Sequence, residues 1–221
     1  MDGGDGVLAD VAPRVPGALL GVVAHGVDVV DAIVGVVPVD QGVVKADPQP
    51  LAAKGLDMGK SLVETDQLET ALDIEAAAEA AGCKLVLPID LVVAKEFKAH
   101  APHEVKPVAE LAADDMALDV GSMSVDLAAE AINDSKTLIW NGPLGAFEIP
   151  PFDTSTVELA KFAAGQTRTS GLVSVAGGGD TVAALNHAGV ADDFTFVSTA
   201  GGAFLEWMEG RALPGVEALK A

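Results

Sequence analysis

Three glycine-rich loops each follow a short apolar segment directly, and this arrangement is suited to holding an anion. The segments Thr137–Trp140, Leu172–Ala176 and Phe194–Val197 lead into Asn141–Gly145, Gly177–Thr181 and Ser198–Gly202 in turn. Glycine inside regular structure costs roughly 0.5–1 kcal/mol relative to alanine, so three in a row indicate that something approaches the main chain closely. A helix N-terminus contributes about 0.3–1 kcal/mol towards an anion through its N–H groups. One such loop is ordinary turn material. Three at the carboxyl ends of strands in one sheet predict a nucleotide or phosphate site.

Side chains in and beside these loops are suited to complete the site. Asp180 is the candidate magnesium ligand, because Mg²⁺ takes one or two carboxylates together with phosphate oxygens and waters. The alternative for Asp180 is the N-cap of a helix beginning at Thr181, a role worth about 1 kcal/mol. Glu148 is either a ribose-binding acid or an exposed surface acid. Leu144 and Phe147 either line an adenine slot or pack the loop.

Three other motifs fall short of a functional pattern. Gly55–Ser61 is one residue shorter than a P-loop and follows no clear strand, so it is predicted to be a plain loop. Gly4–Ala9 resembles a dinucleotide fingerprint but lies at the start of the chain with no strand before it. His100 and His103 flank Pro102 with no helix to align them, so we expect a solvated loop there and no metal site.

Helical and strand patterns alternate from Leu51 onward. Strands are expected at the three apolar segments above and at Lys84–Ile89, continued by Asp90–Phe97. Helices are expected at Thr65–Ala81 with Gly82 as its stop, Ser122–Ile132, Thr154–Ala164, Thr181–Ala188 and Ala203–Met208. This order implies right-handed βαβ units. The predicted fold class is α/β: a three-layer αβα arrangement with a doubly wound, mostly parallel, Rossmann-like sheet. With seven Phe, two Trp and no Tyr, the core must be aliphatic, as is usual for parallel strands covered on both faces.

The net charge of −20 excludes whole classes of partner. Nucleic acid and anionic membranes are bound by clustered Lys and Arg, so we expect neither partner. A polyanion must instead be held by main-chain N–H groups, helix N-termini and a bound cation. Cys83 is the single cysteine, the N-terminus lacks a basic signal region, and charges and prolines interrupt every apolar run. We therefore expect a cytoplasmic protein without internal disulfides.

Residues 1–50 differ in composition from the rest of the chain. They contain no Ser, Thr, Asn, Glu, Phe or Trp, and Val, Ala, Gly and Asp account for 35 of the 50. All four of these residues have codons beginning with G. One hypothesis is that this segment is wholly or partly an out-of-frame or wrong-strand reading of a GC-rich gene; the other is a genuine Val-rich leader. We accordingly divide the chain into a leader, 1–50, and a nucleotide-binding domain, 51–221.

The motifs together resemble the C-terminal, nucleotide-binding half of phosphoglycerate kinases. WNGPLGAFE (140–148), AGGGDTVAAL (176–185) and VSTAGGAFLEWMEG (197–210) match that half in order and spacing. The match extends back through ALDVGSMSV (117–125), LPIDLVVAKEF (87–97) and KGLDMGKSLVE (54–64). It covers the chain from about Leu51 to the C-terminus.

The resemblance implies a role for each matching residue in passing a phosphoryl group between 1,3-bisphosphoglycerate and Mg·ADP, a step of glycolysis. Base and sugar contacts would come from Gly121, Asn141, Gly142, Leu144 and Phe147, and Glu148 would bind the ribose. Gly177, Gly178, Gly179, Asp180 and Thr181 would lie at the phosphates, with Asp180 on the magnesium. The catalytic contacts would be made by Gly178, Gly201 and Gly202, which would face the transferring phosphoryl group.

The sequence departs from the family upstream of Leu51. The phosphoglycerate-binding N-terminal domain, the Gly-Gly-Ala-Lys segment and the triple-Gly-Met strand end have no counterpart in it, and Ala200 replaces a frequent glycine. We therefore expect a monomeric fragment that binds ATP or ADP with Mg²⁺, binds phosphoglycerate only when the other half is supplied, and is nearly inactive alone. The alternative is a non-catalytic module that binds a nucleotide or a protein partner. Strand formation by Val15–Val44 would favour that alternative.

Overall fold

The main sheet of the protein has four strands in the order β1-β7-β8-β9. The computed structural model describes residues 35–38, 42–44, 48–80, 83–199 and 212–219. The strands are β1 (Gly35–Pro38), β7 (Thr137–Asn141), β8 (Val173–Gly177) and β9 (Phe196–Ser198). β7, β8 and β9 run parallel to one another, and β1 pairs with β7 in the antiparallel direction. The parallel part is the part that carries the glycine loops.

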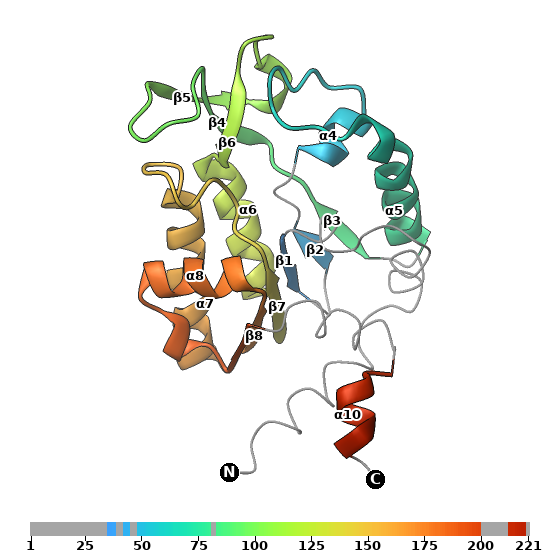
Figure 1. Ribbon diagram of the computed structural model, residues 1–221, viewed down its shortest axis with the longest axis vertical. Helices are drawn as coiled ribbons and strands as arrows, with labels where there is room; N and C mark the ends of the chain where they lie inside the picture. Colours follow the sequence, from blue (N-terminus) through green and yellow to red (C-terminus); the bar gives the residue numbers. More distant parts are fainter. Residues whose placement is uncertain (1–34, 39–41, 45–47, 81–82, 200–211, 220–221) are drawn as a thin grey trace.

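Three helices lie together beside this sheet (Figure 1): α6 (Ser122–Asn133), α7 (Thr154–Ser170) and α8 (Gly179–Ala188). α5 (Leu68–Ala80) packs instead against β3 (Lys84–Val86). A two-stranded parallel sheet of β2 (Gly42–Val44) and β3 (Lys84–Val86) lies on the side of α5. The predicted three-layer, Rossmann-like α/β fold is confirmed.

A separate three-stranded antiparallel sheet was not predicted. It has the order β5-β4-β6 and consists of β4 (Asp90–Ala94), β5 (His103–Pro107) and β6 (Met116–Val120). The sequence predicted one strand through Lys84–Phe97, which is wrong because the chain passes from one sheet to another around Pro88. Proline has no N–H to donate to a ladder, so it favours a break there. β5 escaped detection because it is a largely exposed edge strand of polar residues.

Several boundaries differ from those expected. One turn of 3₁₀ helix (Thr65–Gln67) precedes α5, and β9 begins two residues later than predicted. α7 continues six residues beyond Ala164 and stops at Gly171, which adopts the left-handed φ of 73°. The helix expected at 203–208 lies outside the described residues. The remaining elements are α4 (Gln49–Ala53), α10 (Pro214–Leu219) and the 3₁₀ turns Val108–Glu110 and Ala191–Asp193. Within the described ranges, no helix combines the length and the apolar character needed to cross a membrane.

The core is aliphatic, as the composition predicted. β7 and β8 contribute the buried side chains of Leu138, Ile139 and Val175, and α7 contributes a row of buried small residues. Trp140 is fully buried in β7, with its ring 6.1 Å from that of Phe194 in an edge-on arrangement. This rigid packing fixes the strand ends from which the glycine loops emerge.

Candidate nucleotide site

The carboxyl ends of β7, β8 and β9 lie at one edge of the sheet. Asn141 is in register with Gly177, and Gly177 is in register with Ser198. The first residues of the three glycine loops are therefore neighbours, as the sequence predicted for an open α/β sheet. Gly201 and Gly202 of the third loop lie outside the described residues.

α8 begins at this edge with an open N-terminus. Its N-cap is Gly178, which has a φ of 101° that disfavours any side chain and which donates a hydrogen bond from N to Ser198 O at 3.1 Å. Among the described residues, no side chain caps the helix and none lies in the space where a Cβ on Gly179 would point. Asp180 is an exposed residue in the first turn, so its alternative role as N-cap of a helix from Thr181 is wrong. The first N–H groups of α8 thus face an uncapped opening suited to an anion.

Thr181 joins α8 to the loop after β7. Its side chain is buried, and its Oγ1 accepts a hydrogen bond from Gly142 N at 2.7 Å. Gly142 has a φ of 86°, and its carbonyl accepts a hydrogen bond from Trp140 Nε1 at 2.7 Å. The position of the first glycine loop is therefore set from both sides, by the helix that follows β8 and by the core tryptophan.

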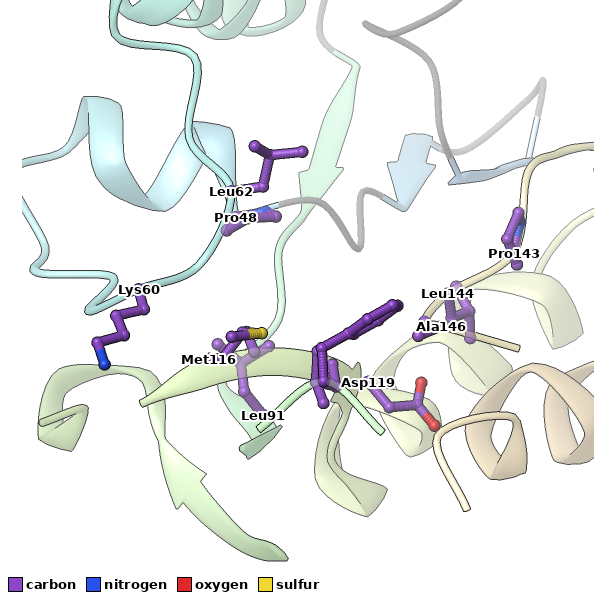
Figure 2. A pocket seen from close by; sticks show the side chains of 13 residues that line it. Pro48, Lys60, Leu62, Leu91, Met116, Asp119, Pro143, Leu144 and Ala146 are labelled. Carbon is purple, nitrogen blue, oxygen red and sulfur yellow. The ribbon is translucent and has the colours of Figure 1, made fainter. Parts of the chain in front are cut away.

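A cavity of about 420 Å³ lies beside the continuation of the same loop (Figure 2). Its mostly apolar lining comes from three regions of the chain: Pro48, Lys60 and Leu62; Leu91, Phe97 and Met116–Asp119; and Pro143–Ala146. Figure 2 shows Lys60 and Leu62 on segments separate from the one that carries Pro143, Leu144 and Ala146. Its size and lining suit a flat organic group.

Sequence reasoning missed several of these lining residues. Lys60 belongs to the stretch predicted to be a plain loop, and Leu62, Phe97 and Met116 were assigned no role. The one available signal was that KGLDMGKSLVE and LPIDLVVAKEF belong to the quoted family motifs. Leu62 is 88% exposed and Phe97 is 59% exposed, so two of the large apolar side chains that line the cavity are exposed to solvent.

Asp119 is a buried carboxyl group in the cavity lining. Its Oδ1 accepts a hydrogen bond from Val120 N at 2.9 Å, and its Oδ2 accepts one from Ser155 N at 3.0 Å. Burial raises the pKa of Asp119 to about 7, against the lowering effect of the hydrogen bonds from Ser155 and Val120. Gly145 packs directly against it, since a Cβ on Gly145 would lie 2.4 Å from Asp119 Oδ1.

A second buried aspartate, Asp90, explains why residue 121 is a glycine. A Cβ on Gly121 would lie 2.1 Å from Asp90 Oδ2. Asp90 accepts hydrogen bonds from Met123 N at 3.2 Å and Ser124 N at 2.8 Å, so it caps α6. The glycine at 121 is thus required by the fold. A contact between Gly121 and a nucleotide base stays a prediction.

The other candidate residues are distributed as follows. Leu144 is buried and lines the cavity, whereas the half-buried Phe147 and the exposed Glu148 are not among its lining residues. His103 lies on β5 rather than in the predicted loop, edge-on to Phe152 at 5.7 Å. In the described part of the chain, no three His, Cys, Asp or Glu residues gather as a metal site.

Comparison with known proteins gives one consistent family. Residues 49–211 match the family described as "Phosphoglycerate kinase". The chain is 65% identical over 171 residues to the phosphoglycerate kinase of Zymomonas mobilis and 66% identical over 170 residues to that of Sinorhizobium medicae. Each alignment covers 77% of this chain and 43% of the relative. The chain therefore spans less than half the length of these relatives.

The solved structure of phosphoglycerate kinase from Coxiella burnetii has a TM-score of 0.75 and 35% identity, covering 91% of this chain and 49% of that one. The Pyrococcus horikoshii enzyme, at 23% identity and a TM-score of 0.67, shares the fold.

Proposed function

The chain belongs to the phosphoglycerate kinase family, and we propose that it binds an adenine nucleotide with magnesium at the shared edge of β7, β8 and β9. The observation that carries this proposal is the uncapped N-terminus of α8, which lies beside two further strand ends on a molecule of net charge −20. Side-chain charge repels a polyanion from such a molecule. The N–H groups of α8 supply local positive polarity without any lysine or arginine.

In the proposed complex, residues 51–221 form the nucleotide-binding domain. Gly177–Thr181 hold the phosphates, and Asp180 offers its exposed carboxylate to the magnesium. The base lies in the cavity beside Leu144, with Gly121, Asn141, Gly142 and Phe147 contributing to the base and sugar contacts. Glu148 accepts hydrogen bonds from the ribose hydroxyls.

The reaction proposed for the whole protein is transfer of a phosphoryl group from 1,3-bisphosphoglycerate to ADP. Bound magnesium would neutralise charge that develops on the phosphate oxygens. Gly178, Gly201 and Gly202 would contact the transferring group through their main chain. Such transfer depends on holding both substrates in line. The relatives are more than twice as long as the matched region, so we propose that phosphoglycerate binding needs their other half and that this chain alone turns over negligibly.

Titration calorimetry with MgADP tests the nucleotide proposal. The unaltered chain is expected to bind MgADP, and Asp180→Ala is expected to weaken that binding. ADP without magnesium should respond less to the substitution, because Asp180 acts through the cation. Asp192→Ala is the matched control, since Asp192 is an exposed acid in the 3₁₀ turn that precedes β9 rather than at its carboxyl end.

Three results would each contradict a different part of the proposal. Undetectable MgADP binding by the unaltered chain would refute the nucleotide site itself. Equal MgADP affinity in Asp180→Ala and the unaltered chain would remove Asp180 from the site while leaving the site in place. A coupled assay that gave full turnover with 1,3-bisphosphoglycerate would refute only the proposed need for the other half.

A non-catalytic binding module is the second candidate, and one observation favours it. β1 and β2 lie outside the region that matches the family, yet β1 pairs with β7 and β2 pairs with β3. Strands that complete a sheet are what a free-standing module requires.

We propose a cytoplasmic monomer. Size-exclusion chromatography tests its assembly, because unpaired apolar edges in residues 1–50 would give oligomers.

A further inference from the structure

We propose that Asp119 is a positioning residue for the base-binding cavity, where it holds residues 143–146 as one wall. The inference rests on the proposed function, because it takes the occupant of the cavity to be an adenine base. Asp119 makes no proposed contact with phosphate or metal. It acts through the main chain of β6, α7 and the loop after β7.

Asp119 joins the end of β6 to the first turn of α7. The carboxylate accepts Ser155 N at 3.0 Å, and in return Ser155 Oγ donates to Val120 O at 2.7 Å. Both side chains are buried, so water does not compete for these bonds. The strand end and the helix N-terminus are thus held together by a reciprocal pair of hydrogen bonds.

The loop of the cavity wall lies against this junction at three consecutive residues. Leu144 N donates to Thr156 Oγ1 at 3.0 Å, and Ala146 N donates to Leu118 O at 2.8 Å. Between them Gly145 packs so closely on Asp119 that even a methyl group would collide with Oδ1. Each contact is made to a residue adjacent to Asp119 or Ser155, or to Asp119 itself. The position of residues 143–146 therefore depends on the junction between β6 and α7 that Asp119 holds together.

The geometry of Figure 2 agrees with a positioning role. The Asp119 carboxyl group points away from Leu62 and Pro48, which belong to another part of the lining. Its hydrogen bonds reach the main chain around the junction. A flat base between the two parts of the lining gains contact only when their separation fits, so movement of residues 143–146 costs affinity for the base. The proposed phosphate contacts at α8 do not involve residues 143–146, so movement of these residues should not change the affinity for phosphate.

The experiment measures the binding of two ligands to the full 221-residue chain at pH 8: adenosine, which has no phosphate, and magnesium tripolyphosphate, which has no base. Asp119→Ala and Asp119→Asn are expected to weaken adenosine binding about tenfold or more, the equivalent of about 1.4 kcal/mol. Asp119→Asn should lose less than Asp119→Ala, because the amide keeps one oxygen acceptor. Tripolyphosphate affinity should not change in either variant.

Ser174→Ala is the control for lost stability. Ser174 is a fully buried polar residue near the opposite end of β8, where it bonds Thr167 and Thr195. This variant should be less stable yet bind both ligands normally. If the Asp119 variants do not fold, Gly145→Ala tests the same contact, and a selective loss of adenosine binding is again expected.

The results separate the two proposals. Unchanged adenosine binding in the Asp119 or Gly145 variants overturns the positioning role, as does equal weakening of both ligands. Failure of the unaltered chain to bind adenosine overturns the proposed base site, and the inference with it. If the unaltered chain bound tripolyphosphate but not adenosine, the base site and the inference would both be overturned, and the phosphate site would stand.

Discussion

The hydrogen bond between Thr181 and Gly142 allows a direct test of how the first glycine loop is held. Thr181→Val keeps the shape of the side chain but replaces the hydroxyl by a methyl group. The Thr181 side chain is 1% exposed, and its Oγ1 accepts Gly142 N at 2.7 Å. Valine therefore leaves the Gly142 N–H without its acceptor inside the fold.

The expected loss follows from that one unmade bond. A fully buried donor left without a partner costs about 1–3 kcal/mol, and Gly142 is half-buried, so its N–H is expected towards the lower end of that range. The packing change between Thr and Val is small by comparison, because the two side chains occupy nearly the same volume. We expect the free energy of unfolding to fall by about 1–2 kcal/mol. At the usual dependence on urea, this moves the unfolding midpoint by roughly 0.5–1 M without a change in slope.

Urea denaturation measures the stability, and calorimetry with MgADP measures the consequence for binding. MgADP should bind more weakly, because the loop that contains Asn141 and Gly142 is no longer tied to α8. The matched control is Thr169→Val in α7. Its hydroxyl also makes a hydrogen bond, to Gly165 O at 2.8 Å, but it lies in solvent. We expect a change within about 0.5 kcal/mol for the control.

Two outcomes would refute parts of this reasoning. If Thr181→Val were as stable as the unaltered chain, the hydrogen bond would carry no net energy. If stability fell but MgADP affinity stayed the same, the bond would support the fold without setting the nucleotide site.

Three further predictions concern charge. The folded-state pKa of Asp119 is raised by burial from 3.8 to about 7, so stability should fall as pH rises between about 4 and 7. Urea midpoints should show this slope in the unaltered chain, and an equal slope in Asp119→Asn would count against it. For Asp115, burial raises the pKa, but hydrogen bonds from Lys106 and Lys95 hold it below its usual range. Stability should therefore be lost as pH falls below about 4, and Asp115→Asn should reduce this acid sensitivity. Finally, sodium chloride at about 0.15 M should not weaken MgADP binding, because salt screens the long-range repulsion by the acidic chain. A steep loss of affinity in calorimetry would indicate binding by lysines instead.

The elements around the glycine loops could be predicted from sequence because local signals agreed there. Thr137–Trp140 is a continuous apolar run bounded by polar residues, and it is a fully buried central strand. The three glycines at 177–179 marked the strand-to-helix junction correctly, although α8 begins two residues earlier than expected. That difference arises because Gly178, with its positive φ, is the N-cap and not Asp180.

The antiparallel sheet and the cavity could not be predicted because they depend on long-range pairing. β4 pairs with β5 and with β6, which begins 26 residues after the start of β4, and β5 has no apolar alternation to reveal it. Lys60 and Leu62 reach the cavity only through this tertiary arrangement. Asp119 carries no local sign of its proposed role either, since that role depends on Ser155, 36 residues away, and on the glycine at 145.

Three glycines of the family motifs differ in what lies beside them. At Gly121 and Gly145 the space for a Cβ is already taken by the carboxylates of Asp90 and Asp119, so the fold itself requires glycine there. At Gly179 no described residue occupies that space, and the glycine is exposed at a helix N-terminus that no described side chain caps. Alanine at the first two positions must displace a buried aspartate, whereas alanine at Gly179 displaces nothing within the described protein. The described residues therefore impose no requirement for glycine at 179, so the effect of Gly179→Ala on MgADP binding tests the proposed approach of a phosphate to the main chain.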